Sequence, residues 1–331
     1  MTAATGTVSE RRWLRPAAWR NLLRDYPLIP LAILLLLLIV VIQLTQPGTV
    51  NAGWAAVNVR QATVLAILAG CQTLTMLTGG IDLSVAYIAS MSGFVTATFV
   101  HQPGGWVLGV AVALAAAALA GLVSGIGIGV FRVHPLIMTL GMGLIVFGFS
   151  NVWQLQNVQT GSGVPVELRT VGTGMAGDLV PYNLVVFVPI AIMLVLLLRR
   201  TGFGRMLYAI GDNPVAARLS GVRSWQVVVV LYVISALLAA VAGLLQSGLS
   251  NIASVSLVVP YLLPSVAAAV IGGTSIVGGR GGYSGSILGA LILTVLAGFL
   301  SIILPEPWRQ IVFGSIVVLV AAAYTRVTAQ S

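Results

Sequence analysis

The side chains that could carry chemistry are few in this chain of 331 residues. It holds seven acidic residues, two histidines, one cysteine (Cys71) and sixteen arginines, and it has no lysine. No catalytic triad or carboxylate pair can be nominated at a common site, and one cysteine cannot support a disulfide framework or a multi-metal cluster. A phosphate-binding loop of the form G-x-x-x-x-G-K-[ST] needs a lysine. The sequence therefore predicts no enzyme, no metal site and no cofactor held by this chain.

The overall composition indicates what surrounds these few polar groups. Hydrophobic residues make up 58% of the chain and charged residues only 7%, whereas soluble domains average roughly a quarter charged residues. So few charges can neither cover a water-exposed surface nor keep a chain disordered. The composition is that of a membrane protein.

The distances between charged residues predict ten membrane spans in an all-helical polytopic fold. A helix needs about 20 largely apolar residues to cross a bilayer core of about 30 Å, and its charges are expected near its ends. By this count Arg60 and Asp82 lie at span ends, and the spans hold almost no ionisable side chain. The expected spans are 28–45, 64–78, two between 82 and 132 separated at 101–105, one from 132 that ends before the polar run 154–162, one between 178 and 199, two between 223 and 280 separated near 247–256, one between 280 and 306, and 309–326.

The arginines test this topology independently, because cytoplasmic loops of membrane proteins collect positive charge. With both termini inside, thirteen arginines face the cytoplasm and only Arg60, Arg169 and Arg309 lie outside. The net charge of +9 follows this rule and indicates no nucleic-acid partner. The predicted organisation is a cytoplasmic N-terminal arm at 1–27, a single transmembrane domain at 28–325 with a cytoplasmic loop at 199–224, and a cytoplasmic tail at 326–331.

A glycine-containing break follows the second expected span, at residues 78–84 (T-G-G-I-D-L-S). Its glycines permit a tight turn, and Asp82 or Ser84 can accept the first free amides of the next helix. A capped turn is one interpretation. The other is a hinge or inner gate, because broken helices near a membrane often line transport pathways. The residues of this predicted gate are Gly79, Gly80, Asp82 and Ser84, with the later pair Gly272 and Gly273.

The loop 199–224 contains a second polar segment with the signals of a short helix. Asp212 or Asn213 can cap it, Pro214 suits its first position and Gly221 suits its end. A helix of about two turns cannot span a bilayer. It could rest on lipid headgroups, but its small apolar face is better suited to a groove in a cytoplasmic partner. The predicted docking residues are Asp212, Asn213, Pro214, Ala216, Ala217, Arg218, Leu219 and Ser220, with Val215 on the apolar face.

Glycines at every fourth position predict close helix packing in two spans. Such stripes let helix backbones approach each other in lipid. If spans two to five and seven to ten form an inverted repeat, as in many transporters, the two stripes are expected at matching places. The stripes are Gly121, Gly125 and Gly129, and Gly281, Gly285 and Gly289.

Four stretches of the chain resemble the sugar-importer permeases of ATP-binding cassette systems, of the ribose, xylose and galactofuranose type. They occur in the same order as in that family and together cover most of the chain between residues 60 and 300. The stretches are L-T-G-G-I-D-L-S-V (77–85), H-P-L-I-M-T-L-G (134–141), the loop 204–221, and V-A-A-A-V-I-G-G-T-S (266–275) continuing into G-G-R-G (278–281).

The resemblance implies a permease dimer in a bacterial cytoplasmic (inner) membrane, in contact with its lipid. A tandem-cassette ATPase, with ATP and Mg on that partner, would drive import, and an extracytoplasmic binding protein would deliver a sugar. The family's coupling helix corresponds to residues 212–220. An acidic pair and an arginine that are common in the family are missing here, before residue 266 and after residue 141. The second permease chain can therefore be identical or a homologue.

The residues that touch the transported solute are the least defined by the sequence. Aromatic and amide side chains late in the fifth span could line an outer vestibule, since sugars pack on aromatic faces and bind amides; an interfacial aromatic belt is the competing explanation. A stand-alone carrier or facilitator, and a membrane-embedded enzyme or scaffold, remain alternatives to the importer subunit. The candidate path residues are Phe147, Asn151, Trp153 and Gln154.

Overall fold

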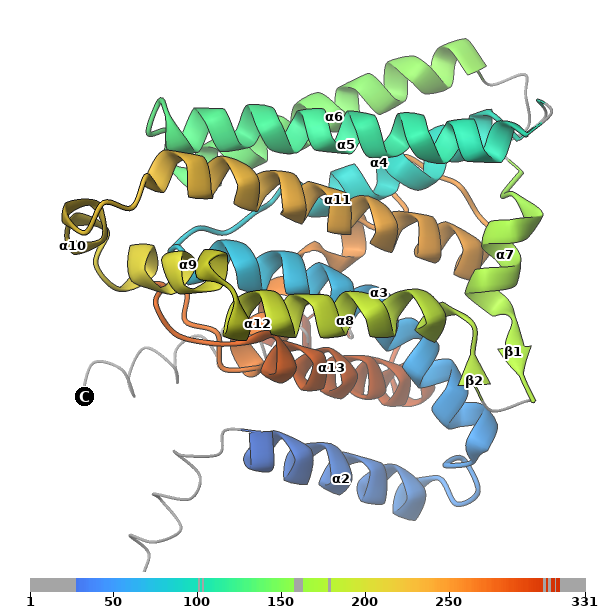
Figure 1. Ribbon diagram of the computed structural model, residues 1–331. Helices are drawn as coiled ribbons and strands as arrows, with labels where there is room; N and C mark the ends of the chain where they lie inside the picture. The colour runs from blue at the N-terminus through green and yellow to red at the C-terminus, as the bar shows by residue number, and fades with distance from the viewer. Residues whose placement is uncertain are drawn as a thin grey trace, which may run out of the picture.

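The computed structural model describes residues 28–100, 102, 104–157, 163–177, 180–305, 308, 311–312 and 314–315. These residues form a bundle of long, roughly parallel helices with one small β-ribbon (Figure 1). Strand β1 (Met175–Ala176) pairs antiparallel with β2 (Val180–Pro181), and the 3₁₀ turn η3 (Val259–Tyr261) precedes α12. The α-helices are α2 (Leu28–Thr45), α3 (Ala52–Leu77), α4 (Val85–Thr98), α5 (Gly105–Gly129), α6 (Pro135–Asn157), α7 (Val166–Thr173), α8 (Asn183–Arg200), α9 (Gly202–Asp212), α10 (Pro214–Leu219), α11 (Ser224–Ser250), α12 (Leu262–Ile271) and α13 (Tyr283–Ile303).

Seven of these helices are long and apolar enough to cross a bilayer: α2, α3, α5, α6, α8, α11 and α13. Two shorter apolar elements, α4 and η3 with α12, accompany them. The predicted polytopic all-helical fold is confirmed, and seven of the ten expected spans correspond to helices of spanning length. Two further expected spans correspond to α4 and to η3 with α12, which are shorter than a span. The tenth expected span, at 309–326, lies largely outside the described residues, as do the whole N-terminal arm and tail.

Two helices, α3 and α11, form the centre of the bundle and pack against each other. α11 also packs on α4 and α5, while α3 packs on α12 and α13. The helices around this centre also pack in pairs: α4 contacts α5, and α12 contacts α13. α3 and α11 thus each pack on a short helix and on the long helix that follows it, while the inverted repeat of spans two to five and seven to ten stays a prediction.

The first glycine stripe packs α5 on α11, as predicted. A Cβ on Gly121 would lie 2.6 Å from the Tyr232 carbonyl oxygen, and one on Gly125 would lie 2.7 Å from the Val229 Cα. The second stripe serves a different contact, since a Cβ on Gly285 would lie 1.9 Å from the Gly272 oxygen of the chain following α12. The prediction that the two stripes occupy matching places is wrong, because one ends α5 and the other begins α13.

The start of α3 also differs from the sequence prediction. α3 begins at Ala52, where Asn51 caps it by accepting a 2.9 Å hydrogen bond from the Trp54 amide. Arg60 therefore lies within the helix and not at its end. The Asn183 side chain donates a hydrogen bond to the Arg60 carbonyl oxygen at 2.9 Å. The effective cap lies upstream of the arginine, so the charge does not mark the helix boundary.

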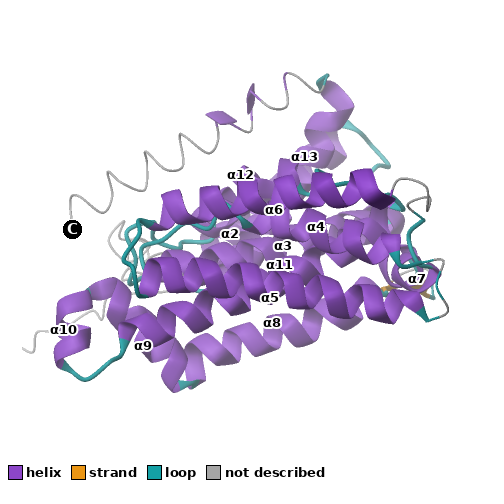
Figure 2. Ribbon diagram, turned by 90° about the horizontal axis from the view of Figure 1, so that it is seen from above, coloured by secondary structure: helices purple, strands orange, loops and turns teal. Residues whose placement is uncertain are grey.

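The two ends of the bundle differ in charge. α9 and α10 project at one end and α7 lies at the other (Figure 2). The arginines at the α10 end include Arg132 after α5, Arg199 and Arg200 at the end of α8, and Arg280 before α13, whereas Arg169 lies on α7. The described arginines are thus distributed as the predicted topology requires.

Candidate functional site

The loop 199–224 contains two helices, α9 and α10, where the sequence predicted one. α9 begins with the Thr201 hydroxyl accepting from the Gly204 amide at 3.1 Å. α10 begins at Pro214, and the Asn213 side-chain oxygen accepts from the amides of Val215 and Ala216, both at 3.0 Å. The predicted Asn213 cap and the proline at the first helical position are confirmed. The predicted helix end is also confirmed, since Gly221 has a φ of +85° just beyond α10. The helix is shorter than predicted, because Asp212 ends α9 instead.

α10 presents apolar side chains to the exterior. Leu219 is 85% exposed and Val215 is 56% exposed, and Figure 1 shows α10 as the outermost element at its end of the bundle. Ala217 is buried in the core that joins α10 to the bundle, so it cannot meet a partner directly. Its assignment as a docking residue is corrected for that reason. The exposed apolar face consists of Val215, Ala216 and Leu219.

The turn 78–84 is a buried polar cluster. Asp82 is 1% exposed, and its Oδ1 accepts hydrogen bonds from the Ser84 amide at 3.0 Å and from the Ser84 hydroxyl at 2.5 Å. Its Oδ2 accepts from the Ser235 hydroxyl of α11 at 3.1 Å. Asp82 thus accepts from an amide at the start of α4, as predicted. The Ser84 hydroxyl instead donates to Asp82 and does not cap α4. Asp82 lies between the end of α3 and the start of α4, as expected of a span end, but its carboxylate is buried among the helices.

Two further side chains hold the same turn from neighbouring helices. The Gln72 amide of α3 donates to the Asp82 carbonyl oxygen at 2.8 Å, and Thr139 of α6 accepts from the Leu83 amide at 3.0 Å. Together with Ser235, these contacts tie the turn to α3, α6 and α11. No motif in the sequence predicted the roles of Gln72, Thr139 and Ser235. Their signal was present, because a polar side chain inside a membrane span needs an internal partner.

The two predicted gate segments meet at the α10 end of the bundle. The first is the turn 78–84, and the second is the loop 272–282 between α12 and α13. The Gly279 amide donates to the Leu77 carbonyl oxygen at 3.0 Å, and a Cβ on Gly79 would lie 3.1 Å from the Val277 oxygen. Gly79 and Gly273 have φ angles of +79° and +88°, which only glycine adopts readily. The structure therefore brings the loop that follows Gly272 and Gly273 against Gly79, although the contacts themselves are made by Val277 and Gly279.

The candidate path residues lie on α6, at its end remote from α10. Phe147 packs edge-on against Tyr87 with ring centroids 5.8 Å apart, and the Trp153 indole donates to the Thr98 hydroxyl at 3.2 Å. Both aromatic side chains thus help to pack α6 on α4. The Asn151 amide donates to the Phe147 carbonyl oxygen at 2.7 Å, while Gln154 is exposed.

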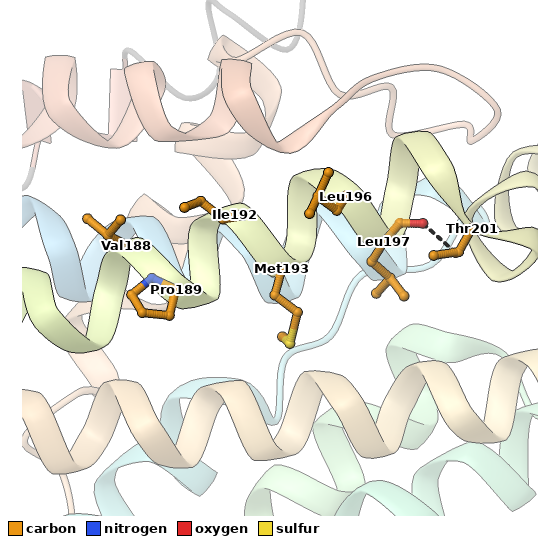
Figure 3. A pocket seen from close by; sticks show the side chains of 7 residues that line it. All are labelled: Val188, Pro189, Ile192, Met193, Leu196, Leu197 and Thr201. Atoms are coloured by element: carbon orange, nitrogen blue, oxygen red, sulfur yellow. Dashed lines mark hydrogen bonds between the residues drawn. The ribbon is translucent and has the colours of Figure 1, made fainter.

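A groove of about 630 Å³ runs along α8 (Figure 3). Its polar member, Thr201, donates to the Leu197 carbonyl oxygen at 2.6 Å, and the remaining lining is apolar. Such a groove suits an acyl chain or another helix and offers no hydrogen bond to a sugar. In the part of the chain that the structure describes, no three His, Cys, Asp or Glu side chains gather as metal ligands. The lining residues are Val188, Pro189, Ile192, Met193, Leu196, Leu197 and Thr201.

Comparison with known proteins gives a consistent result over nearly the whole chain. The family model for the permease component of branched-chain amino acid transport systems matches residues 56–321. The chain is 34% identical over 328 residues to the ribose import permease protein RbsC of Escherichia coli (strain K12), covering 96% of this chain and 97% of that protein. It is 31% identical to the fructose import permease protein FrcC of Rhizobium meliloti (89% and 84% covered). It is 30% identical to the galactose/methyl galactoside import permease protein MglC of Haemophilus influenzae (87% and 91% covered). No solved structure shows a significant match.

Proposed function

The chain belongs to the family of permease components of branched-chain amino acid transport systems, and we propose that it is the membrane subunit of an ATP-driven importer of a sugar or related polyol. Its relatives named for ribose, fructose and galactose support a sugar over an amino acid as substrate. A permease component moves the solute and does not itself catalyse a reaction. An ATPase and a binding protein are implied as partners. The finer assignment is a tandem-cassette ATPase, an extracytoplasmic sugar-binding protein and a second permease chain, identical or homologous.

The observation that carries the proposal is the position of α10. Its exposed face of Val215, Ala216 and Leu219 lies at the arginine-rich end, which the positive-inside rule places in the cytoplasm. Exposed apolar side chains outside the bundle gain free energy when a partner covers them. We assign α10 as the coupling helix that docks in the ATPase, with both chain termini on the same side of the inner membrane.

We infer an alternating-access mechanism, which the attachment of α10 to the bundle supports. ATP binding and release in the partner would move α10 as a rigid lever, since Ala217 fixes it to the bundle. Its motion would tilt the spans around a central path and open the gate formed by the turn 78–84 and the loop 272–282. The proposed path residues Phe147, Asn151, Trp153 and Gln154 would meet the solute before this gate. The transport step is a shift between two populations and forms no covalent intermediate.

The substitution Leu219→Asp tests the docking assignment. Burying a carboxylate in an apolar groove is strongly unfavourable, so we expect the ATPase to be lost from the purified complex while membrane insertion is unchanged. Co-purification from detergent-solubilised membranes measures this. Val166→Asp on α7 is the matched control, because Val166 is also exposed (61%) but lies at the opposite end of the bundle. Equal ATPase recovery with Leu219→Asp would contradict the assignment of α10.

Reconstitution into liposomes separates the importer from a stand-alone carrier. With the ATPase and binding protein present, we expect sugar uptake that requires ATP. The chain alone should give no uptake above protein-free liposomes. Uptake by the chain alone would refute the importer mechanism.

A further inference from the structure

Three backbone segments meet at the α10 end without side chains between them. They are the end of α3 at Leu77, the end of α9 at Gly211, and the loop 272–282 at Gly279. A Cβ on Gly211 would lie 1.8 Å from the Leu77 carbonyl oxygen and 2.4 Å from the Gly279 amide nitrogen. These two atoms are themselves hydrogen-bonded to each other at 3.0 Å. Gly211 therefore rests directly on the bond that joins the two gate segments.

The same loop is bound by α9 one turn earlier. The Tyr208 hydroxyl donates to the Gly281 carbonyl oxygen at 2.9 Å. Burial raises the pKa of the Tyr208 hydroxyl above its ordinary value, a shift that Arg199 opposes, so this hydroxyl stays protonated and available as a donor. Gly278 completes the contact, because a Cβ there would lie 3.0 Å from the Gly211 oxygen and 3.1 Å from the Gly79 nitrogen. α9 thus holds the loop at two points, three residues apart.

The position of α9 lets this contact transmit a movement of α10 to the gate segments. α9 packs on α10 on one side and on α3 and α8 on the other (Figure 1). Only Asn213 separates α9 from α10 in the chain. A displacement of α10 is therefore passed to the last turn of α9, where Gly211 meets both gate segments. Because the contacts are between backbone atoms, they cannot be relieved by a side-chain rotation.

We propose that Gly211 and Tyr208 are positioning residues that transmit the motion of the coupling helix α10 to the turn 78–84 and the loop 272–282 together. This inference rests on the proposed function, since it assumes that an ATPase moves α10. The last turn of α9 is in backbone contact with both gate segments. The two segments then move together because Gly211, Leu77 and Gly279 are in direct contact.

The proposal is tested on the complex of the chain with its co-purifying ATPase and binding protein, in liposomes. Sugar uptake and ATP hydrolysis are measured on the same sample, so that uptake per ATP is obtained. Tyr208→Phe removes one hydrogen bond, and we expect uptake per ATP to fall about fivefold. Gly211→Ala should reduce it at least about tenfold, because the backbone contact is forced apart. Neither substitution should release the ATPase.

Gly282→Ala is the matched control within the same loop. Gly282 has an extended φ of 178° and open space around an added Cβ, so uptake per ATP should stay at the wild-type value. If Gly211→Ala does not fold, Tyr208→Phe decides alone, provided that its melting temperature is unchanged. A merely structural role predicts that melting temperature and ATPase recovery fall while uptake per ATP is kept.

Two results separate failure of this inference from failure of the proposed function. Wild-type uptake per ATP in Tyr208→Phe and Gly211→Ala, within a complex that transports normally, would overturn the role of α9 alone. A wild-type chain that binds no ATPase and shows no ATP-dependent uptake would overturn the proposed function, and the inference with it.

Discussion

The substitution Gly243→Val is expected to disrupt the centre of the bundle. Gly243 lies where α11 crosses α4, and a Cβ there would be 1.8 Å from the Ala89 carbonyl oxygen. The backbone of α4 cannot withdraw, because the Ser92 hydroxyl donates to the Ala240 carbonyl oxygen of α11 at 2.8 Å. Overpacking in a dense core costs about 3 kcal/mol at its usual upper end, and we expect at least this loss in the free energy of unfolding.

The chain's single cysteine provides the measurement. Cys71 is fully buried in α3, so a thiol-reactive fluorophore reports its exposure as detergent-solubilised protein is heated. Gly243→Val should expose Cys71 at a much lower temperature than the wild type. The control is Gly148→Val in α6, where an added Cβ meets nothing within 4 Å. Equal melting temperatures for Gly243→Val and the control would show that α4 and α11 do not pack as described.

Local signals explain why much of the architecture could be predicted. Asn213, Pro214 and Gly221 act within a few residues of one another, and each contributes a specific backbone preference. The spacing of Gly121 and Gly125 likewise predicts a close contact between helices, although it does not identify the partner helix. Span positions follow from the length of apolar runs because the bilayer demands a fixed helix length. These features need no knowledge of the tertiary fold.

Contacts between distant segments explain what could not be predicted. The sequence placed Asp82 at a span end as a possible helix cap, but it could not show the partner Ser235, which is 153 residues away in the chain. Gly211 carried no signal beyond its residue type, since its contacts with Leu77 and Gly279 arise only when α3, α9 and the loop 272–282 come together. The separate helix α9 was missed because Arg199 to Arg205 suggested a polar loop. Its apolar side chains find cover only in the assembled bundle.

The substitution Asp82→Ala is expected to abolish most transport. It removes the acceptor of three hydrogen bonds, from the Ser84 amide, the Ser84 hydroxyl and the Ser235 hydroxyl. Each buried donor left without an acceptor costs about 1–3 kcal/mol, so the turn 78–84 should leave its position between α3 and α11. We expect sugar uptake by the reconstituted complex to fall more than about tenfold, together with a lower melting temperature in the Cys71 exposure assay.

Asp82→Asn distinguishes the hydrogen bonds of Asp82 from its charge. An asparagine keeps one oxygen that can accept from the Ser84 amide, and its amide can donate to the Ser235 hydroxyl in place of the lost acceptor. Uptake should therefore remain within about threefold of wild type, since at most one bond is weakened. Glu167→Ala, at an exposed glutamate in the first turn of α7, controls for the stability effect of removing a carboxylate. Equal losses in Asp82→Asn and Asp82→Ala would show that the gate depends on the negative charge.

Wild-type uptake in Asp82→Ala would show that this turn is no gate, because an element that must hold its shape during transport cannot lose its central acceptor without effect.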